Sequence, residues 1–196
     1  MKERILATAD RLFYLQGIRA IGVDTVAAEI GISKRTLYNH FPSKDALIAA
    51  YLERRFVRPP PSAPDASAKT AVTQILSTFD SLERRFASPD FRGCPFVNAV
   101  AEVGSTDRTV KKIAKAFKES RRVWFRERLE QLGVVDAEAL ATQLVLLVDG
   151  SIAQDLVRDD PAMARAAKEA AKVLLRNAGV DVGGGAATVK GKRAPQ

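Results

Sequence analysis

Residues 31–45 read GISKRTLYNHFPSKD and concentrate cationic and aromatic side chains in a short span. Lys34, Arg35 and Lys44 lie close in sequence to His40 and Tyr38. Such a cluster suits a metal site, a catalytic site or a surface that reads nucleic acid. The residues on either side of the cluster decide between these interpretations.

The stretch is embedded in a pattern typical of two short helices joined by a tight turn. Residues 24–30 (DTVAAEI) predict a first helix, with Asp24 as its cap and an apolar face turned inward. Gly31 ends this helix, and Ser33 caps a second helix over residues 34–40. The arrangement is a helix-turn-helix, whose second helix normally lies in the major groove of DNA.

The second helix has one face for packing and another for contact. At about 100° per residue, Leu37 and Phe41 fall together and are expected to pack inward. The outward side chains are those of Lys34, Arg35, Tyr38 and Asn39. Lysine and arginine donate to guanine edges, asparagine pairs with adenine, and a tyrosine ring can meet the methyl group of thymine. Lys44, at the start of the following helix, is placed to hold a phosphate.

The segment VDTVAAEIGISKRTLYNHFPSKDALIAAYLE at 23–53, with ILATADRLFYLQG at 5–17, resembles the tetracycline-repressor-type (TetR) family of transcriptional regulators. The resemblance implies an all-helical homodimer with an N-terminal DNA-binding domain and a larger C-terminal domain that binds a small effector. Repression by blocking a promoter is the usual outcome in that family, and we predict a repressor that a small-molecule effector releases from a palindromic operator. By the resemblance, the residues that face bases are Lys34, Arg35, Thr36 and Asn39. Those that mainly hold phosphates are Thr25, Tyr38, His40 and Lys44, and Ser33 also belongs to the DNA-binding set.

Apolar residues recur at helical spacing along most of the chain, and no segment alternates convincingly as a strand does. We therefore predict an all-α fold of about nine helices: an N-terminal three-helix DNA-binding unit, a connecting fourth helix and a helical C-terminal domain. The helices are expected near 5–17, 24–30, 34–40, 44–55, 69–86, 95–103, 106–131, 136–158 and 161–177.

A proline-rich segment divides the chain. Residues 59–68 read PPPSAPDASA, and its prolines cannot continue a helix. We predict a DNA-binding domain with the connecting helix over 1–55, a linker over 56–68, an effector-binding and dimerisation domain over 69–178, and a disordered basic tail over 179–196.

The last two predicted helices differ in composition from the others. Helix 136–158 carries apolar residues over a wide face, and helix 161–177 is rich in alanine, whose small side chain lets helices approach closely. These features fit a four-helix dimer interface, as the family resemblance implies, or the completion of a monomer core. A two-fold dimer requires a near-palindromic operator with half-sites about 34 Å, or a multiple of that distance, apart.

An effector pocket is predicted among the middle helices, where aromatic side chains are mixed with polar ones. The candidate lining residues are Cys94, Phe96, Val97, Asn98, Phe117, Arg121, Trp124 and Phe125. Each of them is also consistent with ordinary packing. Arg121 is either a counter-ion for an anionic effector or the partner of Glu102 in an ion pair. Cys94 is either a reactive thiol near Arg92 or a buried, inert one.

Composition and charge narrow the class of protein further. The chain has 196 residues, 46% of them apolar, and a net charge of +8, which favour a packed core and an anionic partner. Cys94 is the single cysteine, so an intrachain disulfide is excluded. Charges among the first residues and the shortness of the apolar run 144–148 predict a cytoplasmic protein without a membrane partner.

The single histidine, His40, has no neighbouring ligands for a metal and no nucleophile to activate. We therefore expect no catalytic residues, no metal and no cofactor, only an unidentified small-molecule effector. Two other classes of protein remain as alternatives. One is an enzyme in the C-terminal domain, and the other is an architectural DNA-binding protein that has no effector.

Overall fold

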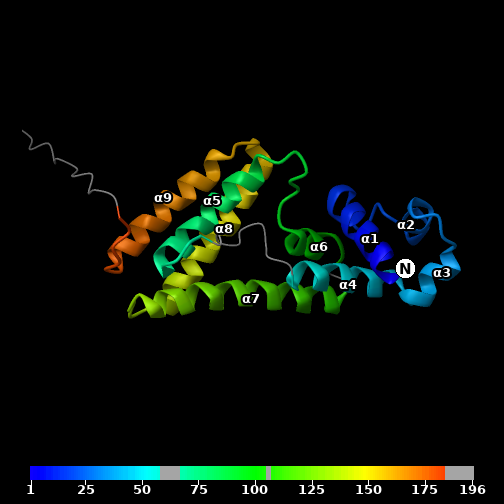
Figure 1. Cartoon of the computed structure of the whole chain (residues 1–196), viewed down its shortest axis with the longest axis horizontal. Coiled ribbons are helices and arrows are strands. Elements are labelled where there is room, and N and C mark those ends of the chain that lie inside the picture. The colour runs from blue at the N-terminus through cyan, green and yellow to red at the C-terminus, as the bar shows by residue number, and fades with distance from the viewer. Residues whose placement is uncertain (58–66, 105–106, 184–196) are drawn as a thin grey trace, which may run out of the picture.

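The computed structural model describes residues 1–57, 67–104 and 107–183, which fold into nine α-helices without a strand (Figure 1). The helices are α1 (Lys2–Gln16), α2 (Val23–Glu29), α3 (Lys34–His40), α4 (Lys44–Val57), α5 (Ala71–Phe86), α6 (Pro95–Val103), α7 (Arg108–Gln131), α8 (Ala137–Arg158) and α9 (Ala162–Asn177). The predicted all-α fold is confirmed. Most of the predicted linker, at 58–66, and of the predicted tail, at 184–196, lies outside the described residues.

Local interactions explain where the helices of the predicted motif begin and end. Gly31 turns the chain with a φ of +70°, a conformation that glycine adopts without steric cost. The Ser33 hydroxyl then accepts a hydrogen bond from the Thr36 N–H at 3.0 Å, which caps α3. α2 begins one residue earlier than predicted, so Asp24 is not its cap. Asp24 lies in the first turn, where the helix dipole also favours a carboxylate.

The N-terminal helices share one hydrophobic core with α6 and the first half of α7. Buried side chains of α1 to α4 pack with Phe96 and Ala99 of α6 and with Phe117 of α7. Phe56 of α4 makes edge contacts with Phe96 and Phe117, at ring-centroid distances of 6.4 and 5.8 Å. The connecting helix is therefore packed directly against the C-terminal helices.

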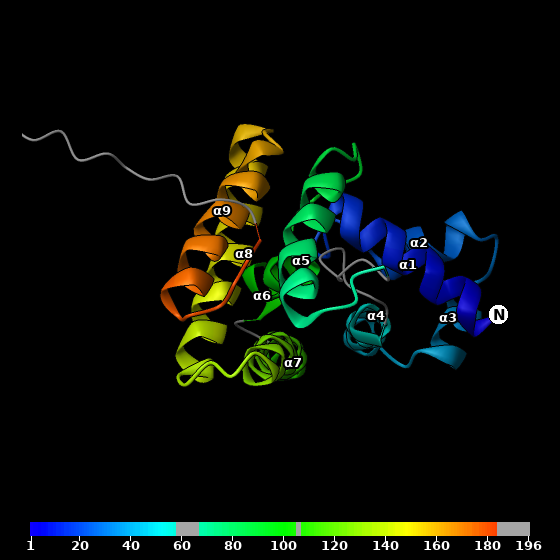
Figure 2. The same ribbon diagram turned by 60° about the vertical axis from the view of Figure 1, so that its left-hand side comes forward.

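A second core lies at the opposite end of the molecule. It is formed by α5, the second half of α7, α8 and α9, with Phe79, Phe125, Leu144 and Ala171 among its most buried side chains. Figure 2 shows α8 and α9 side by side at the end farthest from α3. This core fixes the relative positions of the helices that surround the C-terminal half of α7.

α7 belongs to both cores. Its 24 residues would measure about 36 Å as a regular helix, and Figure 1 shows it running past α4 at one end and α8 at the other. Val110 and Phe117 enter the first core, whereas Phe125 and Leu129 enter the second. α7 thus links the two cores physically.

α8 is the one helix in the described part of the chain that is long and apolar enough, by length and composition alone, to cross a membrane. The longest uninterrupted apolar run, 144–148, is too short to cross a membrane. The helix as a whole is more apolar than this run indicates, because its apolar residues are spread along its length. Leu140, Leu144 and Val148 are buried in the second core. Packing against α7 and α9 therefore explains much of the apolar composition of α8.

Candidate DNA-reading helix and effector cavity

α3 has the two faces that the sequence predicts. Leu37 is fully buried and Phe41, just after the helix, is 3% exposed, so both anchor α3 to the first core. Arg35 and Asn39 are exposed, and Tyr38 is 39% exposed. Figure 1 shows α3 at the outer end of the molecule, where no other helix covers it. The outer face can therefore approach a DNA groove without rearrangement of the core.

Two of the predicted base-reading residues already have partners within the motif. The Lys34 ammonium lies 2.9 Å from a carboxylate oxygen of Asp24, and this hydrogen bond, with the charge of Asp24, raises the pKa of Lys34. The Thr36 hydroxyl lies 2.9 Å from the Ser33 hydroxyl. The first contact joins α3 to α2, and the second lies within the start of α3. Lys34 must exchange its partner before it can donate to a base.

The predicted phosphate-binding residues lie in α3 and at the starts of the helices on either side of it. Thr25 is exposed in the first turn of α2, and His40 is half-buried at the last position of α3. Lys44 is the first residue of α4, and Ser43 caps that helix by accepting a hydrogen bond from the Ala46 N–H at 3.0 Å. The arrangement brings a cation and the start of a helix close to α3, which suits a phosphate.

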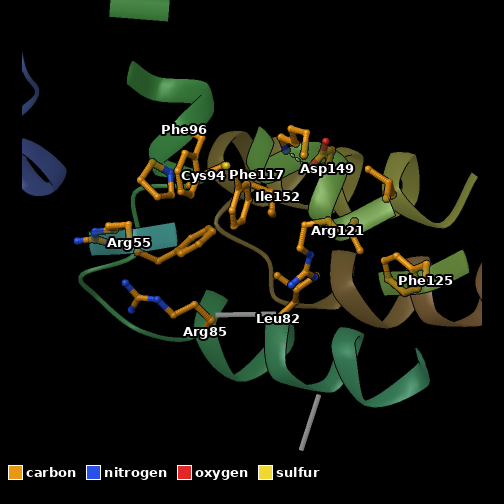
Figure 3. A pocket seen from close by; sticks show the side chains of 16 residues that line it. Arg55, Leu82, Arg85, Cys94, Phe96, Phe117, Arg121, Phe125, Asp149 and Ile152 are labelled. Carbon is orange, nitrogen blue, oxygen red and sulfur yellow. Dashed lines mark hydrogen bonds and ion pairs between the residues drawn. The ribbon is translucent and has the colours of Figure 1, made fainter. Parts of the chain in front are cut away.

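A cavity of about 230 Å³ lies between α4, α5, α6, α7 and α8 (Figure 3). Its lining consists of Arg55, Leu82, Arg85, Phe91, Gly93, Cys94, Pro95, Phe96, Phe117, Lys118, Arg121, Phe125, Val145, Val148, Asp149 and Ile152. Aromatic and aliphatic side chains form most of the wall, and a few charged groups reach into it. This mixture is typical of a small-molecule site.

The structure brings five of the eight predicted pocket residues to this cavity: Cys94, Phe96, Phe117, Arg121 and Phe125. Val97 is 49% exposed, and Trp124 packs under the guanidinium of Arg128 at 4.3 Å, so neither lines it. Asn98 lines a more open hollow beside α1, where its amide donates to the Arg92 carbonyl at 2.6 Å. Helical periodicity cannot separate these positions because neighbouring faces of one helix look alike in sequence.

Four further charged residues of the lining were not predicted from the sequence. Arg55, Arg85, Lys118 and Asp149 come from α4, α5, α7 and α8, and only the tertiary fold brings them together. Arg55 and Arg85 lie at one end of the cavity in Figure 3, and Arg121 lies towards the other. No local motif marked them, since each lies in an ordinary amphipathic helix.

Arg121 points into this cavity and not towards Glu102. A carboxylate oxygen of Glu102 accepts a hydrogen bond from the Arg19 N–H at 2.8 Å, which leaves the predicted Arg121–Glu102 pair unformed. Burial lowers the pKa of Arg121 to about 10, and the nearby charge of Asp149 opposes that shift. Asp149 itself accepts a hydrogen bond from the Lys118 ammonium at 2.5 Å.

Arg55 connects the cavity with the DNA-binding end of the molecule. Its guanidinium donates to both carboxylate oxygens of Asp10 in α1, at 2.6 and 3.2 Å, and both side chains are largely buried. It also stacks over the Tyr14 ring, 4.2 Å from the centroid. The Tyr14 hydroxyl donates to the Gly93 carbonyl and accepts from the Arg92 N–H. α1 is therefore bonded both to α4 and to the loop before α6.

The fold and these two sites define a helix-turn-helix DNA-binding protein whose C-terminal helices enclose a ligand-sized cavity. Residues 5–51 match the family model for bacterial regulatory proteins of the tetR family. Residues 71–170 match the model for the C-terminal domain of LmrA/YxaF-like transcriptional regulators. The chain belongs to the TetR family of DNA-binding transcriptional regulators.

Individual relatives agree with this assignment. The chain is 28% identical over 192 residues to the HTH-type transcriptional regulator YxaF of Bacillus subtilis (strain 168), covering 91% of this chain and 96% of the relative. It is 27% identical over 158 residues to LmrA of the same organism, covering 77% and 84%. The solved structure of SCO4454, a TetR-family regulator from Streptomyces coelicolor, has a TM-score of 0.81 and 34% identity, covering 90% of this chain and 94% of that one.

Proposed function

We propose that this protein is a homodimeric repressor that leaves a palindromic operator when a small molecule binds its cavity. The observation that carries the proposal is the cavity itself, because it contacts α4, the helix that directly follows the DNA-reading helix. An architectural DNA-binding protein without an effector would have no need for it. Because such a repressor binds chromosomal DNA, it would act in the cytoplasm. It would not catalyse a reaction.

Two uncovered apolar stripes support dimerisation through α8 and α9. On α8, the exposed residues Leu146, Gly150, Ala153 and Val157 share one face by helical spacing. On α9, Ala166, Ala170 and Val173 form a similar face, and Val173 is 52% exposed. Small residues along both stripes permit close approach of two helix pairs. A second copy of the chain would remove these faces from water.

A physical route for the effector leads through Arg55. Its side chain lines the cavity and holds Asp10 of α1, so a ligand that attracts or displaces Arg55 would alter the contact between α1 and α4. The position of α3 depends on these two helices, because Leu37 packs into the core that they form. The effector can change DNA occupancy only by binding more tightly to one of the two arrangements.

Selection of bound sequences from a random duplex library, near physiological salt and without ligand, tests the DNA-reading part of the proposal. We expect enrichment of a palindrome. Arg35→Ala should relax the preference at the base it contacts by about 1–3 kcal/mol, because a bidentate base contact is lost. Arg84→Ala, which removes an exposed arginine on α5, is the matched control. Salt-sensitive binding without any enriched sequence would contradict the assignment of α3.

A further inference from the structure

The charge balance of the cavity is strongly one-sided. Among the described residues that line it, Arg55, Arg85, Lys118 and Arg121 are cationic, and Asp149 is the single acid. Asp10, just outside the wall, neutralises Arg55 through their two hydrogen bonds, and Asp149 pairs with Lys118. Of these cations, Arg85 contacts no acidic side chain among the described residues.

Arg85 has only neutral partners in the described residues. Its guanidinium lies 3.5 Å from the Tyr14 hydroxyl and 3.5 Å from the Asp90 carbonyl, both at the outer limit of a hydrogen bond. It also lies over the Phe91 ring at 5.6 Å and over the Tyr14 ring at 5.9 Å. These contacts orient the side chain but leave its strongest possible interaction, a bidentate bond to a carboxylate, unused.

Arg121 adds a second cation in a poorly hydrated position. Burial is the largest influence on its guanidinium and lowers its pKa to about 10, so it stays charged at neutral pH. Charge in a desolvated site attracts an opposite charge more strongly than it would in water. Arg121 therefore adds to the positive potential of the cavity, towards the end opposite Arg85.

The remaining wall is apolar and aromatic. The rings of Phe96 and Phe117 stack at a centroid distance of 3.9 Å, and Phe125, Val148 and Ile152 continue the surface. At about 230 Å³ the cavity falls below the usual range for drug-sized ligands, roughly 300–1,000 Å³. The ligand is therefore expected to be compact, with most of its surface apolar.

We infer that the effector of this regulator is a small, apolar organic carboxylate, with its carboxylate group held by Arg85 and its apolar body packed on the phenylalanine wall. The inference deepens the proposed function and rests on it. Arg85 is on α5 and Arg55 is on α4, yet Figure 3 shows the two at the same end of the cavity. The bound carboxylate would therefore also lie near the Arg55–Asp10 pair that joins α4 to α1.

The test compares carboxylates with their neutral amides on the full-length protein. Naphthoate, cinnamate and biphenyl carboxylate are titrated calorimetrically beside the primary amide of each. The amides match the acids in shape but carry no charge. We expect at least one carboxylate to bind at least tenfold more tightly than its amide. Equal affinity of acid and amide, binding of amides alone, or no binding by any member of the panel would overturn the inference.

Variants of Arg85 test whether this residue binds the carboxylate group. Arg85→Gln is expected to reduce carboxylate affinity at least tenfold and to leave amide affinity unchanged, whereas Arg85→Lys retains part of the preference. Arg84→Gln is the matched control, since Arg84 is on the same helix but outside the cavity lining, and should bind as wild type does. An undiminished acid preference in Arg85→Gln would exclude Arg85 as the anchor, while unchanged amide binding verifies that the variant is folded.

The DNA experiment keeps the two proposals distinguishable. A palindrome selected by the ligand-free protein supports the regulator function whatever the titrations give. If a palindrome is selected and no carboxylate binds, only the ligand class is wrong. If a carboxylate binds but does not reduce occupancy of the selected palindrome, the cavity takes an acid that is not an effector, and the inference fails in that respect.

Discussion

Lys34 illustrates, at the scale of a single residue, how a side chain predicted to contact DNA can also join two helices of the motif. Its contact with Asp24 joins α3 to α2 in the DNA-free protein. Both side chains are well exposed, so the pair adds little to stability, as is usual for surface ion pairs. It keeps the lysine near the outer face of α3, from which donation to a base or a phosphate requires only a change of partner.

Lys44 should behave differently from the base-reading residues. We expect Lys44→Ala to weaken binding to operator and random DNA by the same factor, because a phosphate contact carries no sequence information. The slope of log affinity against log salt concentration should fall in magnitude by about 1 per chain. Fluorescence anisotropy over a salt series measures both. A loss confined to the operator, with an unchanged slope, would show that Lys44 reads a base.

At the scale of one helix, α8 carries a buried acid at an unfavourable position. Asp155 is 4% exposed in the last turn, where the helix dipole disfavours negative charge. One of its carboxylate oxygens has no hydrogen-bond partner among the described residues. Burial first, and then the charges of Asp159 and Asp160, raise the pKa of Asp155.

The raised pKa predicts a pH-dependent stability. Between the unfolded and the higher folded pKa of Asp155, the folded state binds more protons, so stability falls as the pH rises through that window. Asp155→Asn removes the buried charge and should raise the Tm at neutral pH by about 2–4 °C, with a smaller gain near pH 4. Thermal melts across this pH range measure the difference. Asp90→Asn, at an exposed position away from α8, is the control and should change the Tm less. A lower Tm for Asp155→Asn at every pH would refute the account.

At the scale of the whole molecule, the arrangement of the two cores offers a path by which the proposed ligand would influence DNA binding. The first core combines the DNA-binding helices with α6 and the start of α7, so Leu37 of the reading helix and the cavity residues Phe96 and Phe117 belong to one core. α7 continues into the second core, and the uncovered stripes of α8 and α9 lie at its far end. The cavity is lined by residues of both α4 and α8, so a rearrangement of its wall would affect both helices.

The proposed dimer can be tested with a single charge. Ala153→Glu places a carboxylate in the middle of the exposed α8 stripe and should favour the monomer, since two copies would bring like charges together in an apolar interface. Operator affinity should fall by about 100-fold or more, because one half-site then binds without the other. Sedimentation and anisotropy measure these effects. Ala116→Glu, the same change at an exposed position of α7, should alter neither. A dimeric Ala153→Glu would place the interface elsewhere.

The helices and the reading motif were predictable because their signals are local. Ser33, Gly31 and the spacing of Leu37 determine where α3 begins and which face it buries. The cavity was only half predictable. Phe117, Arg121 and Phe125 follow one helix face and were found from periodicity, whereas Arg55 and Arg85 are distant in sequence and carry no local mark.

By itself, the sequence determined the all-α class, the helix-turn-helix and the side chains on the outer face of α3, since caps, turns and helical periodicity act within a few residues. The tertiary structure alone decided which cations share a cavity, that Glu102 serves Arg19 instead of Arg121, and that Asp10 holds Arg55. It also decided which apolar faces of α8 and α9 stay uncovered. The physical reason is that these pairings depend on how whole helices pack, and packing joins residues that are far apart in the chain.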